Sequence, residues 1–218
     1  MSQDAPGYII VEGPIGVGKT SLARRLAATF DSEMLLERAE DNPFLERFYQ
    51  HPRQAALPTQ LSFLFQRIQQ VEHLRQGDMF RGRLVSDFLL EKDRLFAQLT
   101  LDDDELRLYE QVYAHVSVAA PQPDLVIYLQ APVDVLLERI KRRGISYERL
   151  IESAYLQRLA DAYAQLFYHY DQSPLLIVNA SNIDWVENEL DYQSLVEHIR
   201  RTRSGRHYVN PLPTDILA

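Results

Sequence analysis

The most informative absence from this 218-residue sequence is cysteine, of which there is none. The chain therefore forms no disulfide bond and offers no thiolate to a metal ion, and this fits a reducing compartment, so we expect a cytoplasmic protein. Long apolar runs are missing as well, because no stretch approaches the ~20 residues that span a bilayer. We therefore expect no membrane partner. Residues 1–7 combine neither a basic start nor an apolar core, so no secretory signal is expected.

Basic residues are outnumbered, with 23 Lys and Arg against 31 Asp and Glu and a formal net charge of −8. An acidic surface repels the backbone of DNA or RNA, so we expect no nucleic-acid partner and a small, nearly neutral substrate. No internal repeat and no stretch rich in Gly, Pro or Ser divides the chain. Because this length suffices for one well-buried core, we expect a single domain over residues 1–218.

One glycine-rich segment carries the strongest functional signal. It has the spacing G-x-x-x-x-G-K-T, formed by Gly13, Pro14, Ile15, Gly16, Val17, Gly18, Lys19 and Thr20. The apolar residues 8–12 before it predict a buried strand, and apolar residues at helical spacing follow it through 21–30. In that context backbone N–H groups surround phosphate oxygens, Lys19 reaches the β- and γ-phosphates, and the Thr20 hydroxyl holds Mg²⁺. The segment predicts a nucleoside triphosphate site, with ATP as the expected nucleotide.

Strand and helix patterns alternate along the rest of the chain. Further strands are expected at residues 34–36, 84–86, 125–129 and 175–178, with helices at 61–74, 133–140 and 150–170. Such alternation is typical of a parallel sheet covered on both faces. The pattern therefore predicts an α/β fold with about five parallel strands flanked by helices.

Charged residues follow several of these strands. Glu37 comes after the second strand and Asp87 after the third, while the helix after the fourth leads to Lys141, Arg142 and Arg143. Sites in parallel sheets lie at the carboxyl ends of the strands, so we expect these groups to approach the triphosphate. Carboxylates that accept a proton, together with cations that stabilise charge, suit phosphoryl transfer to a hydroxyl group.

A longer set of residues resembles the deoxynucleoside kinases, in particular the bacterial deoxyadenosine/deoxyguanosine kinase branch. It covers most of the chain, from Tyr8 to about Tyr170, and includes Glu37, Asn42-Pro43-Phe44-Leu45, Tyr49, Pro52, Pro58, Gln60, Arg67, Ser86-Asp87 and Asp93. The resemblance implies a P-loop kinase fold with a short arginine-bearing lid at about residues 141–148. It also implies transfer of the γ-phosphoryl group of ATP to the 5′-hydroxyl of a deoxynucleoside, with a leaning towards purines, in nucleotide salvage.

The resemblance implies roles for the residues near the reacting groups. Asp87 is similar to the general base at the 5′-hydroxyl, with a share in binding Mg²⁺. Glu37 is similar to a hydrogen-bond acceptor that orients the same hydroxyl. Three arginines resemble the cations over the phosphates: Arg139, Arg142 and Arg143.

Five further residues resemble those that bind the nucleoside. Tyr49 is similar to the residue whose phenol contacts the deoxyribose 3′-hydroxyl, and Glu148 to the acid that helps to hold that hydroxyl. Gln60 is similar to the amide that contacts the base edge, and an amide suits this role because it offers a donor beside an acceptor. Arg67 and Asp93 resemble the paired charges that close the base pocket.

Two positions depart from the family pattern and leave alternatives open. The animal enzymes have an arginine where this chain has Phe88, and relatives have a further lid arginine where it has Ile145. Fewer cations give less transition-state stabilisation, so a nucleotide-binding regulatory protein with weak or no turnover is one alternative. A thymidylate-type nucleoside monophosphate kinase is another, although Glu37 and Asp87 would repel its acceptor phosphate.

Two expectations concern the surface of the protein. The apolar stripes at residues 61–74 and 106–118 exceed what one sheet face needs, so we expect a homodimer paired through these helices. Residues from about 203 to 218 are expected to form a C-terminal tail, in which residues 208–218 are extended and lie on the body of the domain.

Overall fold

A single sheet of six parallel strands forms the centre of the protein. The computed structural model describes residues 5–76, 82–116, 120–181 and 183–210. The strands lie in the order β2-β3-β1-β4-β5-β6, and every neighbouring pair is parallel. They are β1 (Tyr8–Glu12), β2 (Ser32–Leu35), β3 (Arg83–Ser86), β4 (Leu125–Gln130), β5 (Leu175–Asn179) and β6 (Arg206–Val209). Strands β1, β4 and β5 are almost wholly buried, as expected for apolar strands covered on both faces.

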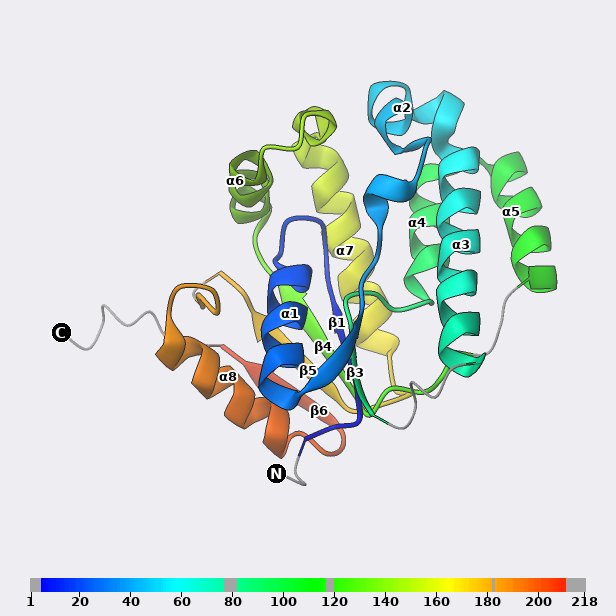
Figure 1. Cartoon of the computed structure of the whole chain (residues 1–218). Helices are drawn as coiled ribbons and strands as arrows, with labels where there is room; N and C mark the ends of the chain where they lie inside the picture. Colours follow the sequence, from blue (N-terminus) through cyan, green and yellow to red (C-terminus); the bar gives the residue numbers. More distant parts are fainter. Residues whose placement is uncertain (1–4, 77–81, 117–119, 182, 211–218) are drawn as a thin grey trace.

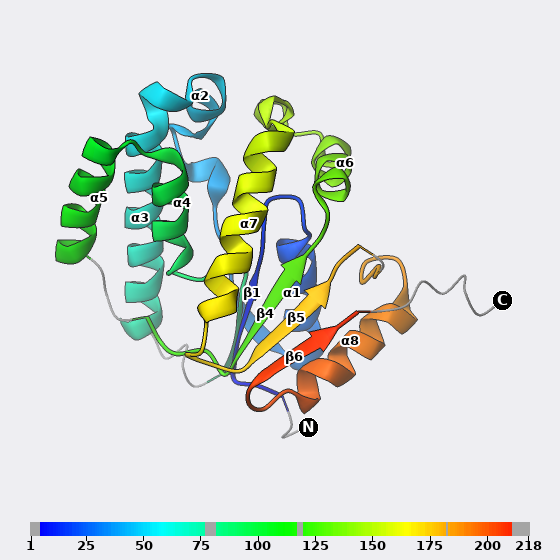
Figure 2. The same ribbon diagram turned by 180° about the vertical axis from the view of Figure 1, so that it is seen from behind.

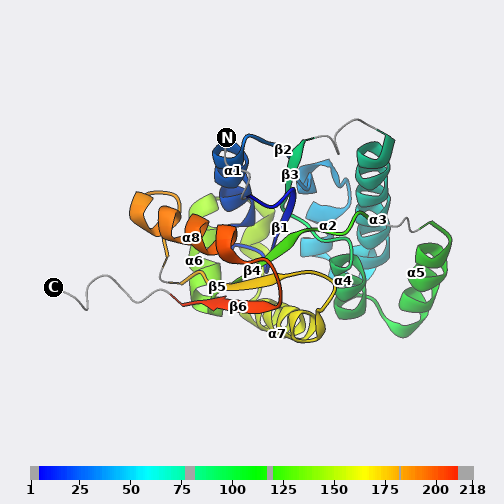
Figure 3. The ribbon, with the colours of Figure 1, turned by 90° about the horizontal axis from the view of Figure 1, so that it is seen from below.

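Helices cover both faces of this sheet (Figures 1 and 2). One face carries α1 (Lys19–Phe30) and α8 (Glu189–Arg201), and the other carries α4 (Lys92–Thr100) and α7 (Ser153–His169). Two more helices stand beside α4, namely α3 (Pro52–Gln76) and α5 (Asp103–Val116), as Figure 3 shows from below. Helices α2 (Leu45–Gln50) and α6 (Val133–Arg143) lie beyond the carboxyl ends of the strands (Figure 2).

Aromatic packing fixes α7 on the sheet. The ring of Phe167 stacks on that of Tyr128 in β4 with 4.2 Å between centroids, and Tyr163 stacks on the same tyrosine at 6.3 Å. Both α7 residues are buried in the main core. Large buried rings contribute much of the stability of a core. The sheet and α7 therefore form a firm base from which the loops at the carboxyl ends of the strands project.

The structure adds one strand to the predicted sheet. The described residues form six strands, which is compatible with the prediction of about five, and the additional strand, β6 (Arg206–Val209), lies within the expected tail 203–218. This strand pairs with β5, with Leu175 opposite Arg206. Only Val209 of its four residues is buried, so an edge strand of this kind lacks the apolar pattern that reveals a strand in a sequence. Residues 211–218 lie outside the described residues.

The helices also extend beyond the predicted ranges. Helix α3 begins at Pro52 rather than at residue 61 and contains Pro58. Helices α2, α4 and α8 form where the sequence pattern predicts none, and α5 ends at Val116, so residues 117–118 of the expected stripe are not described. None of the described helices is long and apolar enough to span a membrane.

Candidate active site

The glycine-rich loop connects the end of β1 to the start of α1, at the centre of the sheet. An added Cβ at Gly13, where φ is 150°, would lie 2.5 Å from the backbone oxygen of Leu129. At Gly18 the backbone is left-handed, with φ of 104°, and an added Cβ would lie 2.8 Å from the ring of Trp185. Both positions therefore require glycine. The loop is held closely between β4 and the segment after β5.

Lys19, the lysine of the loop, donates to the loop's own carbonyls, at 2.8 Å to Gly13 O and 3.2 Å to Pro14 O. Burial, together with the nearby charge of Lys92, lowers the pKa of Lys19. The Lys19 side chain therefore folds back against the loop. In loops of this kind the backbone N–H groups bind phosphate oxygens.

Asp87 joins the loop to the predicted acceptor side. The Thr20 hydroxyl donates to Asp87 Oδ2 at 2.6 Å, and the backbone N–H of Glu37 donates to Asp87 Oδ1 at 2.7 Å. Asp87 is buried, directly after β3, whereas Glu37 follows β2, the neighbouring strand. The structure therefore brings together three predicted site residues from three different strand ends.

Glu37 is surrounded by positive charge. Its Oε2 accepts from Lys92 Nζ at 3.0 Å, and its Oε1 accepts from Arg67 Nε at 3.0 Å. Burial alone would raise the pKa of Glu37, but Lys92 and Arg67 outweigh it and hold that pKa well below its ordinary value. Glu37 is therefore an ionised hydrogen-bond acceptor at neutral pH.

Arg67 also pairs with Asp93, as the family resemblance implied, with 2.7 Å between Nη1 and Oδ2. Asp93 is fully buried, and its other oxygen, Oδ1, accepts a hydrogen bond from the Tyr109 hydroxyl at 3.0 Å. Burial opposes the charge of Arg67, but Asp93 and Glu37 together raise its pKa above the ordinary value. The guanidinium therefore stays charged and ties α3 to α4 and to the loop after β2.

Two charged residues at this centre were missed by the sequence reasoning, Glu12 and Lys92. Glu12 is fully buried and accepts from Gly13 N–H at 2.8 Å, from Tyr163 OH at 3.0 Å and from Leu89 N–H at 2.8 Å. Lys92 Nζ lies 3.7 Å from Glu12 Oε2 as well as 3.0 Å from Glu37. A carboxylate that ends an otherwise apolar strand was the available signal for Glu12. Nothing in the sequence around Lys92 distinguishes it from a surface lysine.

A cavity of about 730 Å³ opens beside these groups. Its walls come from the glycine loop, the segment after β2, helices α2 and α3, and the segment that follows α6. Predicted site residues that line it are Ile15, Gly16, Lys19, Thr20, Glu37, Tyr49, Gln60, Arg67, Asp87, Arg143 and Glu148. The volume is that of a small-molecule site.

One wall of the cavity joins α2 to the predicted lid. Tyr49 stacks on Tyr147 with 5.8 Å between ring centroids and an interplanar angle of 12°. Arg143 Nε donates to Glu148 Oε2 at 3.0 Å, so the lid arginine and the lid acid are paired with each other. Burial raises the pKa of Tyr49 well above its ordinary value, which keeps its phenol protonated and able to donate.

The other two predicted arginines, and the two residues that depart from the family pattern, differ in their position relative to the cavity. Arg139 donates to Val17 O at 3.1 Å and to Ala180 O at 2.7 Å. It therefore connects the backbone of the glycine loop to the segment after β5. Arg142 is exposed on α6 and does not line the cavity. Ile145 lines the cavity, whereas Phe88 is buried outside it. The ring of Phe88 is therefore not among the residues that line the cavity.

Hard oxygen donors meet at Thr20 and Asp87. Such donors fit Mg²⁺, which is bound through one or two carboxylates together with substrate phosphates. In the described part of the chain, no group of three or more His, Cys, Asp or Glu side chains could hold a metal ion. The residues present are those expected to share a cation with a bound triphosphate, and not those of a metal site built from protein alone.

Comparison with known proteins gives a consistent picture. The family model described as "Deoxynucleoside kinase" matches residues 9–203. The chain is 32% identical to the deoxyguanosine kinase of Bacillus subtilis (strain 168), over 88% of this chain and 96% of that protein. It is 28% identical to the deoxyadenosine kinase of Lactobacillus acidophilus (strain ATCC 700396 / NCK56 / N2 / NCFM), over 83% and 88% of the two chains. A solved structure of deoxyadenosine kinase from M. mycoides has the same fold, with a TM-score of 0.76 and 24% identity over 88% of this chain and 98% of that one.

Proposed function

The chain belongs to the deoxynucleoside kinase family, and on that premise we propose that it transfers the γ-phosphoryl group of ATP to the 5′-hydroxyl of a purine deoxynucleoside. Family membership itself makes the chain an enzyme that phosphorylates deoxynucleosides from a nucleotide donor. The choice of ATP with Mg²⁺, the purine preference and the roles of individual residues are the parts that we propose.

The observation that carries the proposal is the hydrogen-bonded connection Thr20–Asp87–Glu37. It runs from the glycine loop, where a triphosphate binds, to the wall of the 730 Å³ cavity, where a nucleoside fits. Donor and acceptor sites thus meet at one carboxylate. A kinase needs this arrangement because most of its catalysis comes from positioning and from charge stabilisation.

Asp87 is the proposed general base. Each of its oxygens accepts one hydrogen bond, from Thr20 and from Glu37 N–H, and each retains a second lone pair for an incoming hydroxyl. A primary alcohol becomes a good nucleophile when a carboxylate within hydrogen-bond reach removes its proton. Glu37, kept ionised by Lys92 and Arg67, accepts from the same hydroxyl and orients it.

On the donor side, Lys19 exchanges its loop carbonyls for phosphate oxygens when the nucleotide binds. Thr20 and Asp87 are the residues that would hold Mg²⁺, which neutralises charge on the phosphate oxygens. Arg143 lies on the cavity wall and reaches the phosphates once it leaves Glu148, and Glu148 then becomes free to accept from the sugar 3′-hydroxyl. Arg139 acts through the loop backbone, and Arg142 is the exposed lid cation.

On the acceptor side, Tyr49 donates to the 3′-hydroxyl and Gln60 contacts the base edge, with the Arg67–Asp93 pair closing the pocket. The curated relatives named above are a deoxyguanosine kinase and a deoxyadenosine kinase, which supports a purine acceptor. Family membership favours the nucleoside acceptor over both alternatives that the sequence left open, the monophosphate kinase and the regulatory protein.

The test is turnover of the purified protein with ATP, Mg²⁺ and each of the four deoxynucleosides or their monophosphates, alongside Asp87→Asn. Asparagine can still accept from Glu37 N–H and donate to Thr20, so the fold should survive, while kcat should fall at least ~100-fold because the base is lost. Asp103→Asn, an exposed aspartate at the start of α5, is the matched control and should keep full activity. Near-normal turnover of Asp87→Asn would refute its role, and phosphorylation of monophosphates alone would refute the proposed acceptor.

We also propose a homodimer paired through α3 and α5. Much of the apolar stripe on these helices packs inside the chain, around Leu64, Ile68 and Tyr109. Phe65 on α3 and Leu108 on α5 nevertheless keep 46% and 48% of their surface exposed, which supports a partner at this side of the molecule. Light scattering at micromolar protein should give twice the 25.3 kDa chain mass, and a monomer mass would overturn the proposal.

A further inference from the structure

Glu12 joins the glycine loop to the segment that carries Asp87. It is the last residue of β1 and is fully buried. One carboxylate oxygen, Oε1, accepts from the backbone N–H of Gly13 at 2.8 Å, and the other, Oε2, accepts from the backbone N–H of Leu89 at 2.8 Å. Gly13 is the first residue of the loop, and Leu89 follows Asp87 by two positions. A single side chain therefore connects the backbone of the donor side with that of the acceptor side.

Strand pairing ends before it reaches the reacting groups. The register of β1 with β3 ends where Ile10 lies opposite Ser86, so both Glu12 and Asp87 lie beyond the paired residues. Past that point the end of β1 is joined to the residues after β3 through the Glu12 carboxylate. The turn around Asp87 is also fixed locally, because Ser86 Oγ accepts from Phe88 N–H at 3.2 Å and donates to Phe88 O at 3.0 Å. The backbone on either side of Asp87 is therefore held in place, and Glu12 ties it to the glycine loop.

The link through Glu12 differs in kind from the hydrogen bond between Thr20 and Asp87. Thr20 and Asp87 line the cavity and are proposed to bind Mg²⁺ and the acceptor hydroxyl, so their contact changes when the substrates bind. Glu12 is not among the residues that line the cavity, and the groups it links are backbone N–H groups. Its carboxylate also accepts from Tyr163 OH at 3.0 Å and lies 3.7 Å from Lys92 Nζ. The Glu12 contacts can therefore persist through the reaction while those of Asp87 rearrange.

We propose that Glu12 is a positioning residue, which sets the separation between the glycine loop and the general base Asp87. The inference rests on the proposed function, in which the triphosphate lies in that loop and Asp87 accepts from the acceptor hydroxyl. A carboxylate suits the role because both of its oxygens accept, so it binds two N–H donors at once. Reacting groups that are misplaced by about 1 Å can lose about 100-fold in rate. Glu12 therefore acts on the rate through the backbone, without contact to either substrate.

The test compares the wild type with Glu12→Gln and with Tyr163→Phe. An amide accepts through its oxygen only, so glutamine keeps one of the two N–H contacts and turns its NH₂ group towards the other N–H. Tyr163→Phe is the matched control, because it removes a hydrogen bond from the same carboxylate and leaves both N–H contacts in place. Each protein is assayed for the rate of phosphoryl transfer in a single turnover with ATP, Mg²⁺ and the best of the four deoxynucleosides. The dissociation constant of each substrate and the Tm are measured beside it.

The transfer rate of Glu12→Gln should fall at least ~10-fold while both dissociation constants stay within about 3-fold of the wild type, because the two sites are intact but displaced from each other. Tyr163→Phe should keep the wild-type rate, whatever its Tm. A purely structural role of Glu12 predicts that the affinities fall together with the rate, or that Tyr163→Phe loses as much rate as Glu12→Gln. Either of these results, or an unchanged rate in Glu12→Gln, would overturn the inference.

Glu12→Asp is the second variant, for the case in which Glu12→Gln does not fold. Aspartate keeps the charge near Lys92 but is a methylene shorter, so it cannot reach both N–H groups, and its transfer rate should also fall at least ~10-fold with little change in affinity. If neither variant folds, the carboxylate serves the fold rather than the rate, and the inference is overturned. A wild type inactive with every deoxynucleoside would overturn the proposed function and this inference with it, whereas an active wild type beside a fully active Glu12→Gln would overturn the inference alone.

Discussion

Replacing Lys92 with methionine should destabilise the protein strongly, although the residue lies outside the sequence motifs. Its side chain is 3% exposed and its Nζ lies between Glu37 Oε2 at 3.0 Å and Glu12 Oε2 at 3.7 Å. Methionine has a similar length and is apolar. The substitution therefore removes the charge, with little change in packing, and leaves two neighbouring carboxylates with fewer cations.

The magnitude follows from the burial of the partners. Breaking a buried ion pair by removing one member costs about 3–5 kcal/mol, because the other charge stays buried and uncompensated. Glu12 is fully buried, but Glu37 is 20% exposed and keeps Arg67, so the lower end of the range applies. A loss of about 3 kcal/mol is a large part of the ~5–15 kcal/mol that stabilises a typical domain. In a chain of this size it should lower Tm by about 6–12 °C.

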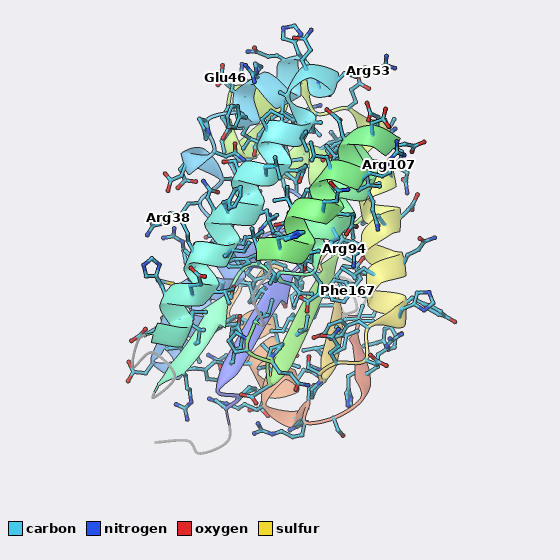
Figure 4. The ribbon with its side chains drawn as sticks, turned by 90° about the vertical axis from the view of Figure 1, so that its right-hand side faces the viewer. Arg38, Glu46, Arg53, Arg94, Arg107 and Phe167 are labelled. Atoms are coloured by element: carbon cyan, nitrogen blue, oxygen red, sulfur yellow. The ribbon has the colours of Figure 1, made fainter. Side chains whose placement is uncertain are left out.

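The assay is urea unfolding with thermal unfolding beside it, and Arg94→Met on the same helix is the matched control. Arg94 pairs with Glu110 at 2.9 Å, but 51% of its side chain is exposed. It lies on the helical side of the molecule shown in Figure 4. An exposed pair contributes at most about 1 kcal/mol. If the two variants lose the same free energy of unfolding, the reasoning from burial is wrong.

Three further predictions test other parts of the site. The depressed pKa of Glu37 contributes stability that is present above the ordinary pKa of 4.5 and is lost as the pH falls below it. The urea midpoint of the wild type should therefore drop on acidification below that pH, and the midpoint of Glu37→Gln should drop less. Parallel pH curves for the two proteins would contradict this. Gly13→Ala places a methyl group 2.5 Å from a backbone oxygen and should abolish ATP binding, whereas Gly82→Ala, with open space around the added Cβ, should bind normally in calorimetry. Tyr49→Phe keeps the stacked ring and should leave Tm unchanged, while KM for the deoxynucleoside should rise roughly 10-fold through loss of one hydrogen bond; an unchanged KM would remove the phenol from the sugar site.

The local pattern of the sequence was sufficient to predict the glycine loop and the parallel sheet. Strand ends meet at one edge of such a sheet, which is why Glu37 and Asp87 were expected to lie near the loop, and the structure joins both to Thr20. The pairing of Arg67 with Asp93 was implied by the family resemblance rather than by the local pattern, and it is present.

The remainder depended on contacts between distant segments. Lys92 reaches Glu37 and Glu12 only because α4 packs beside α3 and α7, and helical spacing alone does not reveal which polar residues of α4 turn inward. Glu12 was missed because residues 8–12 were interpreted only as a buried strand. The edge strand β6 depends on pairing with β5 rather than on its own apolar residues.

The contact between Trp185 and the glycine loop gives the protein an internal optical reporter. Trp185 is the only tryptophan in the sequence, is 3% exposed, and packs against Gly18 on the donor side. The aromatic residues of the acceptor wall, Tyr49 and Tyr147, are both tyrosines. Light absorbed at the red edge of the protein spectrum therefore excites the donor side alone. Occupancy of the nucleotide loop can be followed by emission, without a label, in the same sample in which the acceptor is titrated.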